Sequence, residues 1–162
     1  EMDINFDKNG EIGRRGEIDI NLMKQLNSIP YYSESAPKSL GREYMENHHL
    51  QILKSYKISI EDKLRTFYQH IAEQISKSIA DLPKGSVLIT GGGAHNDFLI
   101  EQIKACTFHD IIIPQKQIID YKEAIIFAFL GFLRILNEVN VLRSVTGAKN
   151  NSISGSVIVY NN

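Results

Sequence analysis

The chain has 162 residues, of which 43% are hydrophobic and 23% charged, and its formal net charge at pH 7 is −1. This composition fits a globular domain with a core, argues against disorder, and offers no basic face for nucleic acid. The single cysteine, Cys106, excludes an intramolecular disulfide and fits a reducing compartment.

Residues 124–133 form the most apolar run of the chain, with Glu123 and Arg134 on either side. A membrane span needs about 20 apolar residues, roughly twice the length of this run. We therefore predict a buried helix here, and we expect neither a membrane nor a nucleic acid as a partner.

The first part of the chain predicts a turn followed by helices. Residues 7–10 end in Asn-Gly, a pair that tolerates positive φ angles and is typical of turns. Asp19 can cap a short helix that runs through Leu26. Residues 33–41 are polar and contain a proline, which predicts a loop, and residues 42–54 predict a further helix.

The clearest helical pattern lies between residues 60 and 79. Apolar side chains recur there every three or four residues, at Ile60, Leu64, Phe67, Tyr68, Ile71, Ala72, Ile75 and Ile79. Ser59 and Asp62 have the spacing of a capping box at its start. Pro83 and Gly85 predict its end.

Two short apolar runs, residues 86–90 and 111–113, predict strands. Three glycines follow the first run, and Asn96 can then cap a helix. A long apolar helix is predicted from Asp120 to about Glu138.

Residues 147–155 are a polar stretch, and residues 156–160 predict a last strand. Helices thus alternate with short buried strands, which predicts an α/β fold with a parallel sheet. We expect residues 1–162 to form a single domain of this class.

The strongest local signal for function is a glycine turn between a predicted strand and a predicted helix. It consists of Thr90, Gly91, Gly92, Gly93, Ala94, His95 and Asn96. Three glycines remove every Cβ, so a ligand can approach the main chain at a place where α/β folds bind ligands. The amides of the next helix favour anions, which suits the ribose and phosphates of a nucleotide. A tight turn without a ligand is the alternative, and His95 and Asn96 fit a solvent-facing side chain and a helix cap as well as ligand contacts.

Glu123 is the second candidate, because a carboxylate in a cleft can accept hydrogen bonds from sugar hydroxyls. Asp120 and Glu123 also have the spacing of a capping box, in which Glu123 would satisfy backbone amides. Spacing alone favours the cap over the sugar contact.

Two further segments are open to either a functional or a structural interpretation. Residues 38–43 can touch a phosphate or a sugar or form a solvated loop, and residues 144–148 can line a cleft or merely connect two elements. His48 and His49 are adjacent rather than one helical turn apart and have no Cys or Asp cluster nearby, so we expect no metal site.

Four groups of residues, taken together, resemble the anhydro-N-acetylmuramic acid kinase family in the order in which that family has them. They are Pro37, Lys38, Ser39, Leu40, Gly41, Arg42 and Glu43; Leu88, Ile89 and the glycine turn; Asp120, Tyr121, Lys122, Glu123 and Ala124 with Phe127 and Ala128; and Asn140 with Ser144, Val145, Thr146, Gly147 and Ala148. The resemblance runs from about Asp7 to the end of the chain.

This resemblance implies a fold of the superfamily that joins sugar kinases, heat-shock chaperones and actin, with two ribonuclease-H-like lobes and ATP in the cleft between them. The chain would be part of the C-terminal lobe, without the N-terminal lobe and its phosphate loop. The family's reaction opens the 1,6-anhydro ring of a peptidoglycan-derived amino sugar and phosphorylates its 6-oxygen, using ATP and Mg²⁺, in cell-wall recycling in the bacterial cytoplasm.

The resemblance also implies roles for residues. Thr90, Gly91, Gly92, Gly93 and Asn96 would bind the nucleotide, and Glu123 would contact the sugar, while residues 38–43 and 144–148 receive no role. The catalytic base is expected upstream of residue 1, so we expect this chain to contain no catalytic residue and to be inactive alone. A non-catalytic nucleotide-binding or interaction module on the same fold is the alternative.

A lobe without its first strands exposes a sheet edge and apolar surface. We therefore expect the isolated chain to self-associate, for example as a domain-swapped homodimer.

Overall fold

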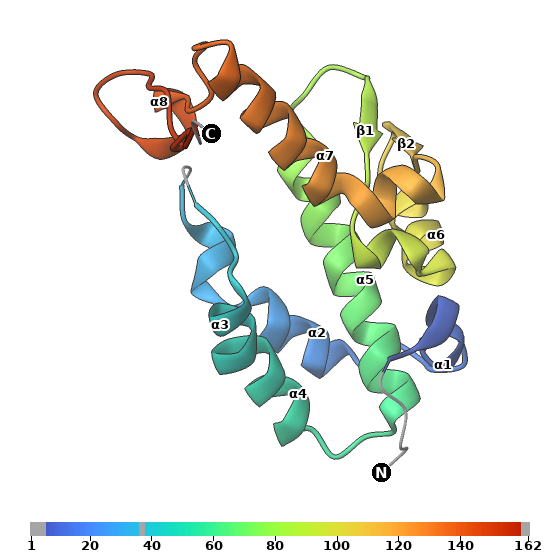
Figure 1. Ribbon diagram of the computed structural model, residues 1–162. Coiled ribbons are helices and arrows are strands. Elements are labelled where there is room, and N and C mark those ends of the chain that lie inside the picture. Colours follow the sequence, from blue (N-terminus) through green and yellow to red (C-terminus); the bar gives the residue numbers. More distant parts are fainter. Residues whose placement is uncertain (1–5, 36–37, 160–162) are drawn as a thin grey trace. The chain divides into compact units, whose positions relative to one another are not determined.

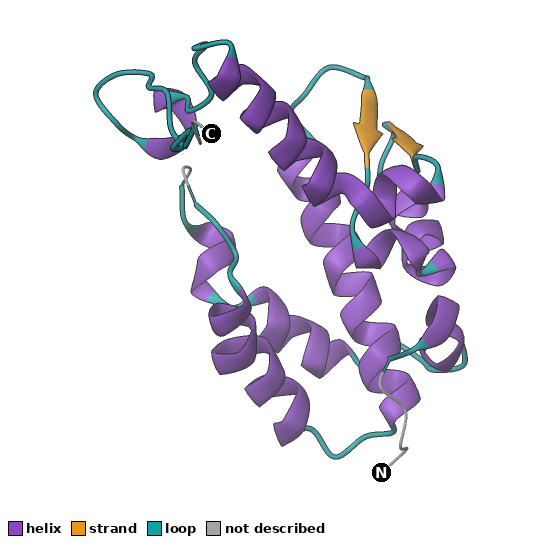
Figure 2. Cartoon of the chain, in the orientation of Figure 1, coloured by secondary structure: helices purple, strands orange, loops and turns teal. Residues whose placement is uncertain are grey.

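The computed structural model (Figure 1) describes residues 6–35 and 38–159. These residues divide into two compact units. The first unit ends at Pro114, and the second begins at Gln115. Helices predominate in both, and two short strands lie in the first unit (Figure 2). The chain is therefore of the α/β class, as predicted, whereas its assignment as one domain stays a prediction.

In chain order, the first unit contains η1 (Lys8–Gly10), α1 (Glu11–Arg14), α2 (Ile20–Asn27), η2 (Pro30–Ser33), α3 (Arg42–Tyr44), the π-helical η3 (Met45–His49), α4 (Leu50–Ser55), α5 (Ile60–Ile79), β1 (Ser86–Leu88), η4 (Gly92–His95), α6 (Asp97–Cys106) and β2 (Asp110–Ile112). The second contains α7 (Lys116–Ile135) and α8 (Arg143–Thr146).

The turns and caps of the first unit follow the sequence closely. Asn9 and Gly10 have φ angles of 55° and 73°, which confirms the predicted turn. Asp19 accepts a hydrogen bond from the Leu22 amide and caps α2. Ser59 Oγ accepts one from the Asp62 amide at the start of α5, but the Asp62 carboxylate accepts the Glu17 amide, so only half of the predicted capping box forms.

Helix α5 is the centre of the first unit, with α1, α2 and α6 packed around it (Figure 1). One face packs on a cluster built around Leu22, Leu26 and Ile29, and Phe67 of α5 joins this cluster. Ala72, on another part of the helix, packs with Ile100 and Ile103 of α6. The amphipathic pattern that predicted α5 therefore reflects two separate contacts rather than one core face.

Strands β1 and β2 pair in parallel, with Val87 opposite Ile111, as the sequence predicted. The prediction that they are buried was wrong, because Leu88 and Ile112 are 60% and 46% exposed. Alternate residues of a strand point to opposite faces. Val87 and Ile111 are half-buried, whereas the opposite face of this two-stranded sheet is open within the described residues.

His109 joins the end of α5 to the sheet. Its Nδ1 accepts a hydrogen bond from the Gly85 amide at 3.2 Å, and its Nε2 donates to the Ile79 carbonyl at 2.9 Å. Because one ring nitrogen accepts and the other donates, the buried imidazole is satisfied in its neutral form. The side chain therefore has a structural role.

In the second unit, α7 differs from its prediction in two ways. It begins at Lys116, one turn before Asp120, with Gln115 at its N-cap position. It is also not buried, since Phe127, Phe129 and Phe132 are all more than half exposed and Ile119 is its one buried residue among those described. Residues 156–159 form no strand, and Tyr160 lies outside the described residues.

Candidate functional site

The glycine turn (residues 90–96) follows β1 and leads through η4 into α6. Gly91 has φ 87° and ψ 179°, a conformation that a residue with a Cβ rarely adopts. A Cβ placed on Gly91 or Gly92 would meet no described atom within 4 Å. The bare main chain at these two glycines therefore faces open space, which is the geometry that close approach of a ligand requires.

Thr90 and Asn96 stand at the two ends of the turn. Within the described part of the chain, Thr90 Oγ1 is buried and has no hydrogen-bond partner. Asn96 Oδ1 accepts a hydrogen bond from the Leu99 amide at 2.9 Å and caps α6, as predicted. Asn96 thus has a structural role already, whereas the buried Thr90 hydroxyl has no hydrogen-bond partner among the described residues.

Glu123 lies in the third turn of α7 and is exposed. The proposed capping box is wrong, because the helix has already begun at Lys116 and Asp120 instead forms an ion pair with Lys116. The backbone amides of Asp120 and Glu123 lie inside the helix and need no cap. This removes the structural explanation for Glu123 and leaves its carboxylate free of capping.

The structure gives local roles to the two segments without a predicted function. Lys38 Nζ donates to the carbonyls of Tyr31 and Glu34, at 2.8 and 2.9 Å, and Arg42 pairs with Glu46 at the surface. Residues 144–146 belong to α8, which Gly147 ends with a φ of 71°. Pro37 lies outside the described residues.

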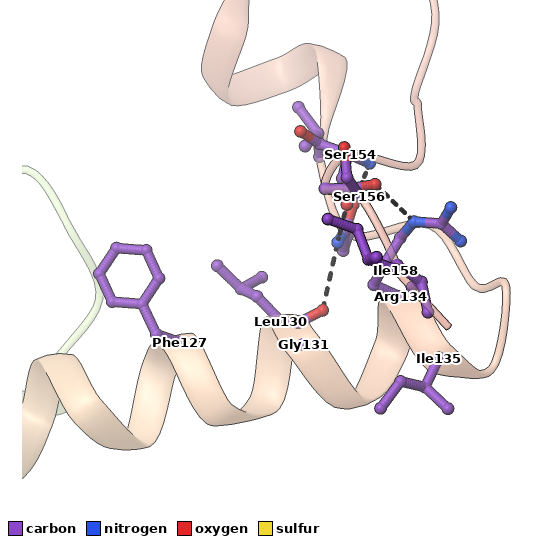
Figure 3. Close-up of a pocket in the computed structure, with 12 residues that line it drawn as sticks. Phe127, Leu130, Gly131, Arg134, Ile135, Ser154, Ser156 and Ile158 are labelled. Carbon is purple, nitrogen blue, oxygen red and sulfur yellow. Dashed lines mark hydrogen bonds between the residues drawn. The ribbon is translucent and has the colours of Figure 1, made fainter. Parts of the chain in front are cut away.

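A pocket of about 610 Å³ lies in the second unit, between the C-terminal half of α7 and residues 154–158 (Figure 3). Asn140 Nδ2 donates to the carbonyls of Leu130 and Ser154, and its Oδ1 accepts the Ser154 amide at 2.7 Å. Arg134 Nε donates to the Gly155 carbonyl at 2.7 Å. Asn140 and Arg134 therefore fasten the C-terminal segment to α7, and Glu123 does not line this pocket.

A buried polar network joins four helical elements of the first unit and was not predicted from the sequence. Tyr32 OH lies 2.7 Å from His49 Nε2 and 3.0 Å from His70 Nε2, and His70 Nδ1 lies 3.0 Å from Asn27 Oδ1, which also accepts from Gln74. Its members come from η2, η3, α2 and α5, so no spacing in the sequence could reveal it. His48 and His49, considered only as metal ligands, in fact have separate roles, because His48 stacks on Tyr44.

These hydrogen bonds define where the protons are. Because Asn27 Oδ1 can only accept, His70 donates from Nδ1 and accepts the Tyr32 proton at Nε2. His49 then donates from Nε2 to the Tyr32 oxygen, and its Nδ1 is left without a partner among the described residues. Burial lowers the pKa of His70 to about 4, lowers that of His49, and raises the pKa of Tyr32 to about 12. The network is therefore neutral at pH 7.

Neither a metal cluster nor a membrane helix is found in the parts of the chain that the structure describes. Residues 6–35 and 38–159 contain no group of three or more His, Cys, Asp or Glu side chains able to hold a metal ion. No helix over the same ranges combines the length and apolar character that crossing a bilayer requires.

Comparison with known proteins gives one consistent match. The family model described as anhydro-N-acetylmuramic acid kinase matches residues 1–160. Curated relatives with that name include proteins from Sulfurovum sp., 34% identical over 97% of this chain and 44% of the relative, and from Clostridioides difficile, 36% identical over 94% of this chain and 42% of the relative. A third, from Rhodococcus erythropolis, is 32% identical over 94% of this chain and 40% of its own length. The chain thus spans less than half the length of these relatives.

Proposed function

The chain belongs to the anhydro-N-acetylmuramic acid kinase family, and from this membership we propose that it forms part of an ATP-dependent kinase that opens the anhydro ring of that sugar and phosphorylates its 6-oxygen. The family match over residues 1–160 carries this proposal. It confirms the family that the four motifs predicted. The proposal includes the physiological setting that goes with this reaction, namely cell-wall recycling in the cytoplasm.

We place the chain in the C-terminal, ribonuclease-H-like lobe of such a kinase. The parallel pairing of β1 and β2 with α6 between them supports this placement, since it is a βαβ unit with the glycine turn after its first strand. Because the chain spans 40–44% of its relatives, we propose that it lacks part of the catalytic machinery and is inactive by itself.

ATP is the phosphoryl donor in this proposal, and the residues of the glycine turn fit it. The open space beside Gly91 and Gly92 admits a phosphate or ribose to the main chain, and the Thr90 hydroxyl is the one side-chain group of the turn left without a described partner. Mg²⁺ would neutralise phosphate charge in phosphoryl transfer. The described residues offer no cluster for the metal, so we assign it no ligand in this chain.

Glu123 is proposed to contact the sugar. An exposed carboxylate without a capping role can accept hydrogen bonds from two hydroxyls. We propose this contact for the complete enzyme, of which the chain is a part.

The test uses the 162-residue chain and a non-hydrolysable ATP analogue with Mg²⁺, followed by amide NMR shifts and calorimetry. We expect shifts at residues 90–93 and a loss of binding in Gly92→Val, whose Cβ meets no described atom and so should leave the fold intact. Gly85→Val is the matched control, since its Cβ would make only an ordinary contact, 3.7 Å from the Pro83 carbonyl oxygen.

Binding elsewhere, or unchanged binding in Gly92→Val, would refute the nucleotide assignment. A phosphorylation assay on the anhydro sugar tests the second part of the proposal. We expect no turnover by the isolated chain, and robust turnover would show that it is a complete enzyme.

A further inference from the structure

A second pocket, of about 590 Å³, lies in the first unit and contains no residue of the glycine turn. Its walls come from η2, the loop that follows it, and the C-terminal half of α5. Its aromatic and polar lining consists of Tyr31, Tyr32, Lys38, Gln74, Lys77 and Ser78. Among the residues that the structure describes, two ammonium groups and no carboxylate line this space, so its charge favours an anion.

One of the two cations is held in place. Lys38 Nζ donates to the carbonyls of Tyr31 and Glu34 and lies 4.7 Å from the centroid of the Tyr31 ring. An ammonium has three donors, and these two carbonyls account for two of them. Because the side chain is already ordered by these contacts, binding an anion costs little further rotamer entropy. Lys38 belongs to residues 38–43, the part of the family motif to which the resemblance assigns no role.

The opposite wall supplies groups that suit hydroxyls. Gln74 donates through Nε2 to Asn27, which leaves its Oε1 as an acceptor, and Ser78 donates to the Gln74 carbonyl, which leaves its oxygen lone pairs. Both residues lie on α5, one turn apart.

The ring of Tyr32 lines the pocket while its hydroxyl belongs to the buried network. His49 and His70 hold the hydroxyl from the core side, so the orientation of the ring is fixed before any ligand arrives. Tyr31, which packs edge-to-face against it with centroids 5.4 Å apart, gives a second aromatic surface. Aromatic and aliphatic surfaces of this kind suit the apolar face of a sugar ring.

We propose that this pocket binds an acidic sugar, with its anionic group between Lys38 and Lys77, its hydroxyls on Gln74 and Ser78, and its ring against Tyr31 and Tyr32. The anion can be a carboxylate or a phosphate, since both take the same ammonium contacts. The choice of N-acetylmuramic acid as a probe rests on the proposed function, whereas the preference for an acidic sugar rests on the lining alone.

The test is an amide NMR titration of the 162-residue chain with four probes. N-acetylmuramic acid and glucose 6-phosphate carry a carboxylate and a phosphate on a sugar, N-acetylglucosamine is the neutral counterpart, and inorganic phosphate is the anion alone. We expect shifts at residues 74–78 with one or both acidic sugars, and binding at least about tenfold weaker for the other two probes.

Lys77→Gln should weaken binding of the acidic sugar by about fivefold or more, since it removes one of two cations. Lys104→Gln, on α6 and outside the pocket, is the charge-matched control and should bind as the unchanged chain does. Equal binding of N-acetylglucosamine, equal binding of inorganic phosphate, equal losses in the two variants, or no shift in the pocket would each overturn the proposal.

An ATP-analogue titration of the same sample separates this inference from the proposed function. Shifts at the pocket with acidic sugars but none at residues 90–93 with the nucleotide would refute the nucleotide assignment alone. The reverse result would refute the pocket alone.

Discussion

The hydroxyl of Tyr32 lies 3.0 Å from Nε2 of His70, and both side chains belong to a network that is closed to solvent at His70. The phenol donates this hydrogen bond, so His70 must be neutral at Nε2 for the network to form. Protonation of His70 would remove this acceptor and place an uncompensated charge in the core, so the Tyr32 hydroxyl would have to turn its proton away. The stability of the first unit therefore depends on the charge of one imidazole.

We predict that the chain loses stability as the pH falls below about 6.5. Burial holds the folded-state pKa of His70 at about 4, below its ordinary value of 6.5, so the unfolded chain binds a proton first. The penalty starts at the unfolded pKa, reaches about 2 kcal/mol at pH 5, and levels off below the folded pKa. His49, whose pKa is also lowered, adds to it in the same direction.

Urea denaturation at pH 7.5, 6 and 5 measures this effect. The carboxylates Asp62 and Glu101 have lowered pKa values, so they also stabilise the folded chain. Their contribution is lost at a lower pH than that of His70, because it falls only where carboxylates become protonated. His70→Gln should flatten the dependence between pH 7.5 and 5, whereas the exposed His48→Gln should not. An unchanged midpoint from pH 7.5 to 5 would show that His70 is not the buried neutral base described.

Gly16→Ala should be among the most destabilising single changes in the chain. A Cβ at Gly16 would overlap the backbone carbonyl of Glu61 at the start of α5, and backbone atoms cannot move aside as a side chain can. We expect a loss of at least about 3 kcal/mol or failure to fold. Gly131→Ala is the control, because its Cβ meets no described atom and alanine favours the interior of α7, so we expect up to about 1 kcal/mol of stabilisation.

The midpoint of urea denaturation, measured for each variant and for the unchanged chain, tests both expectations. If Gly16→Ala proved as stable as the unchanged chain, residues 13–16 would not lie against α5 as closely as described.

Local signals in the sequence predicted the features that neighbouring residues determine. Asp19, Ser59 and Asn96 cap helices, because the side chain of each accepts a hydrogen bond from the amide three residues later. Asn9 and Gly10 form a turn because both adopt positive φ angles. The parallel pairing of the strands followed from the alternation of helices and strands.

What depends on distant residues could not be predicted in the same way. Asp62 does not complete the predicted capping box, because its carboxylate accepts a hydrogen bond from the Glu17 amide, 45 residues away in sequence. The apolar pattern of residues 124–133 indicated burial, but burial also needs a second surface, and the described residues give Phe127 and Phe129 none. The pocket beside Lys38 joins an η2 turn to α5, and no motif spans that separation.

Asn140→Ala should loosen the second unit locally. The Asn140 side chain makes three hydrogen bonds that join α7 to Ser154, and the neighbouring Val141 pairs with Ser152 through an isolated bridge. These bonds are partly exposed, so we expect a loss of about 1–2 kcal/mol in local stability. Hydrogen exchange at the Val141 and Ser152 amides should become about tenfold faster.

Asn150→Ala, in the exposed loop of the same unit, is the matched control and should leave the exchange of both amides unchanged. Equal exchange in the two variants would mean that the Asn140 side chain does not fasten the C-terminal segment.

The exposed apolar surface of the chain should make it self-associate. Phe127, Phe129 and Phe132 of α7 are 69%, 59% and 57% exposed, and the sheet of the first unit has two strands within the described residues. Apolar area of this kind drives association at roughly 25 cal/mol per Å² buried. We therefore expect the isolated chain to form dimers or larger species at micromolar concentration in sedimentation velocity, with the fraction rising on addition of salt.

Replacing Phe127 and Phe132 together by serine should shift the distribution toward monomer, because it removes two aromatic side chains without creating a cavity. Replacing the exposed polar pair Lys149 and Asn150 by serine is the control and should change nothing. The salt response separates the causes, since apolar association strengthens with salt whereas association through ion pairs weakens. A monomer at every concentration and salt level would show that this surface does not drive self-association.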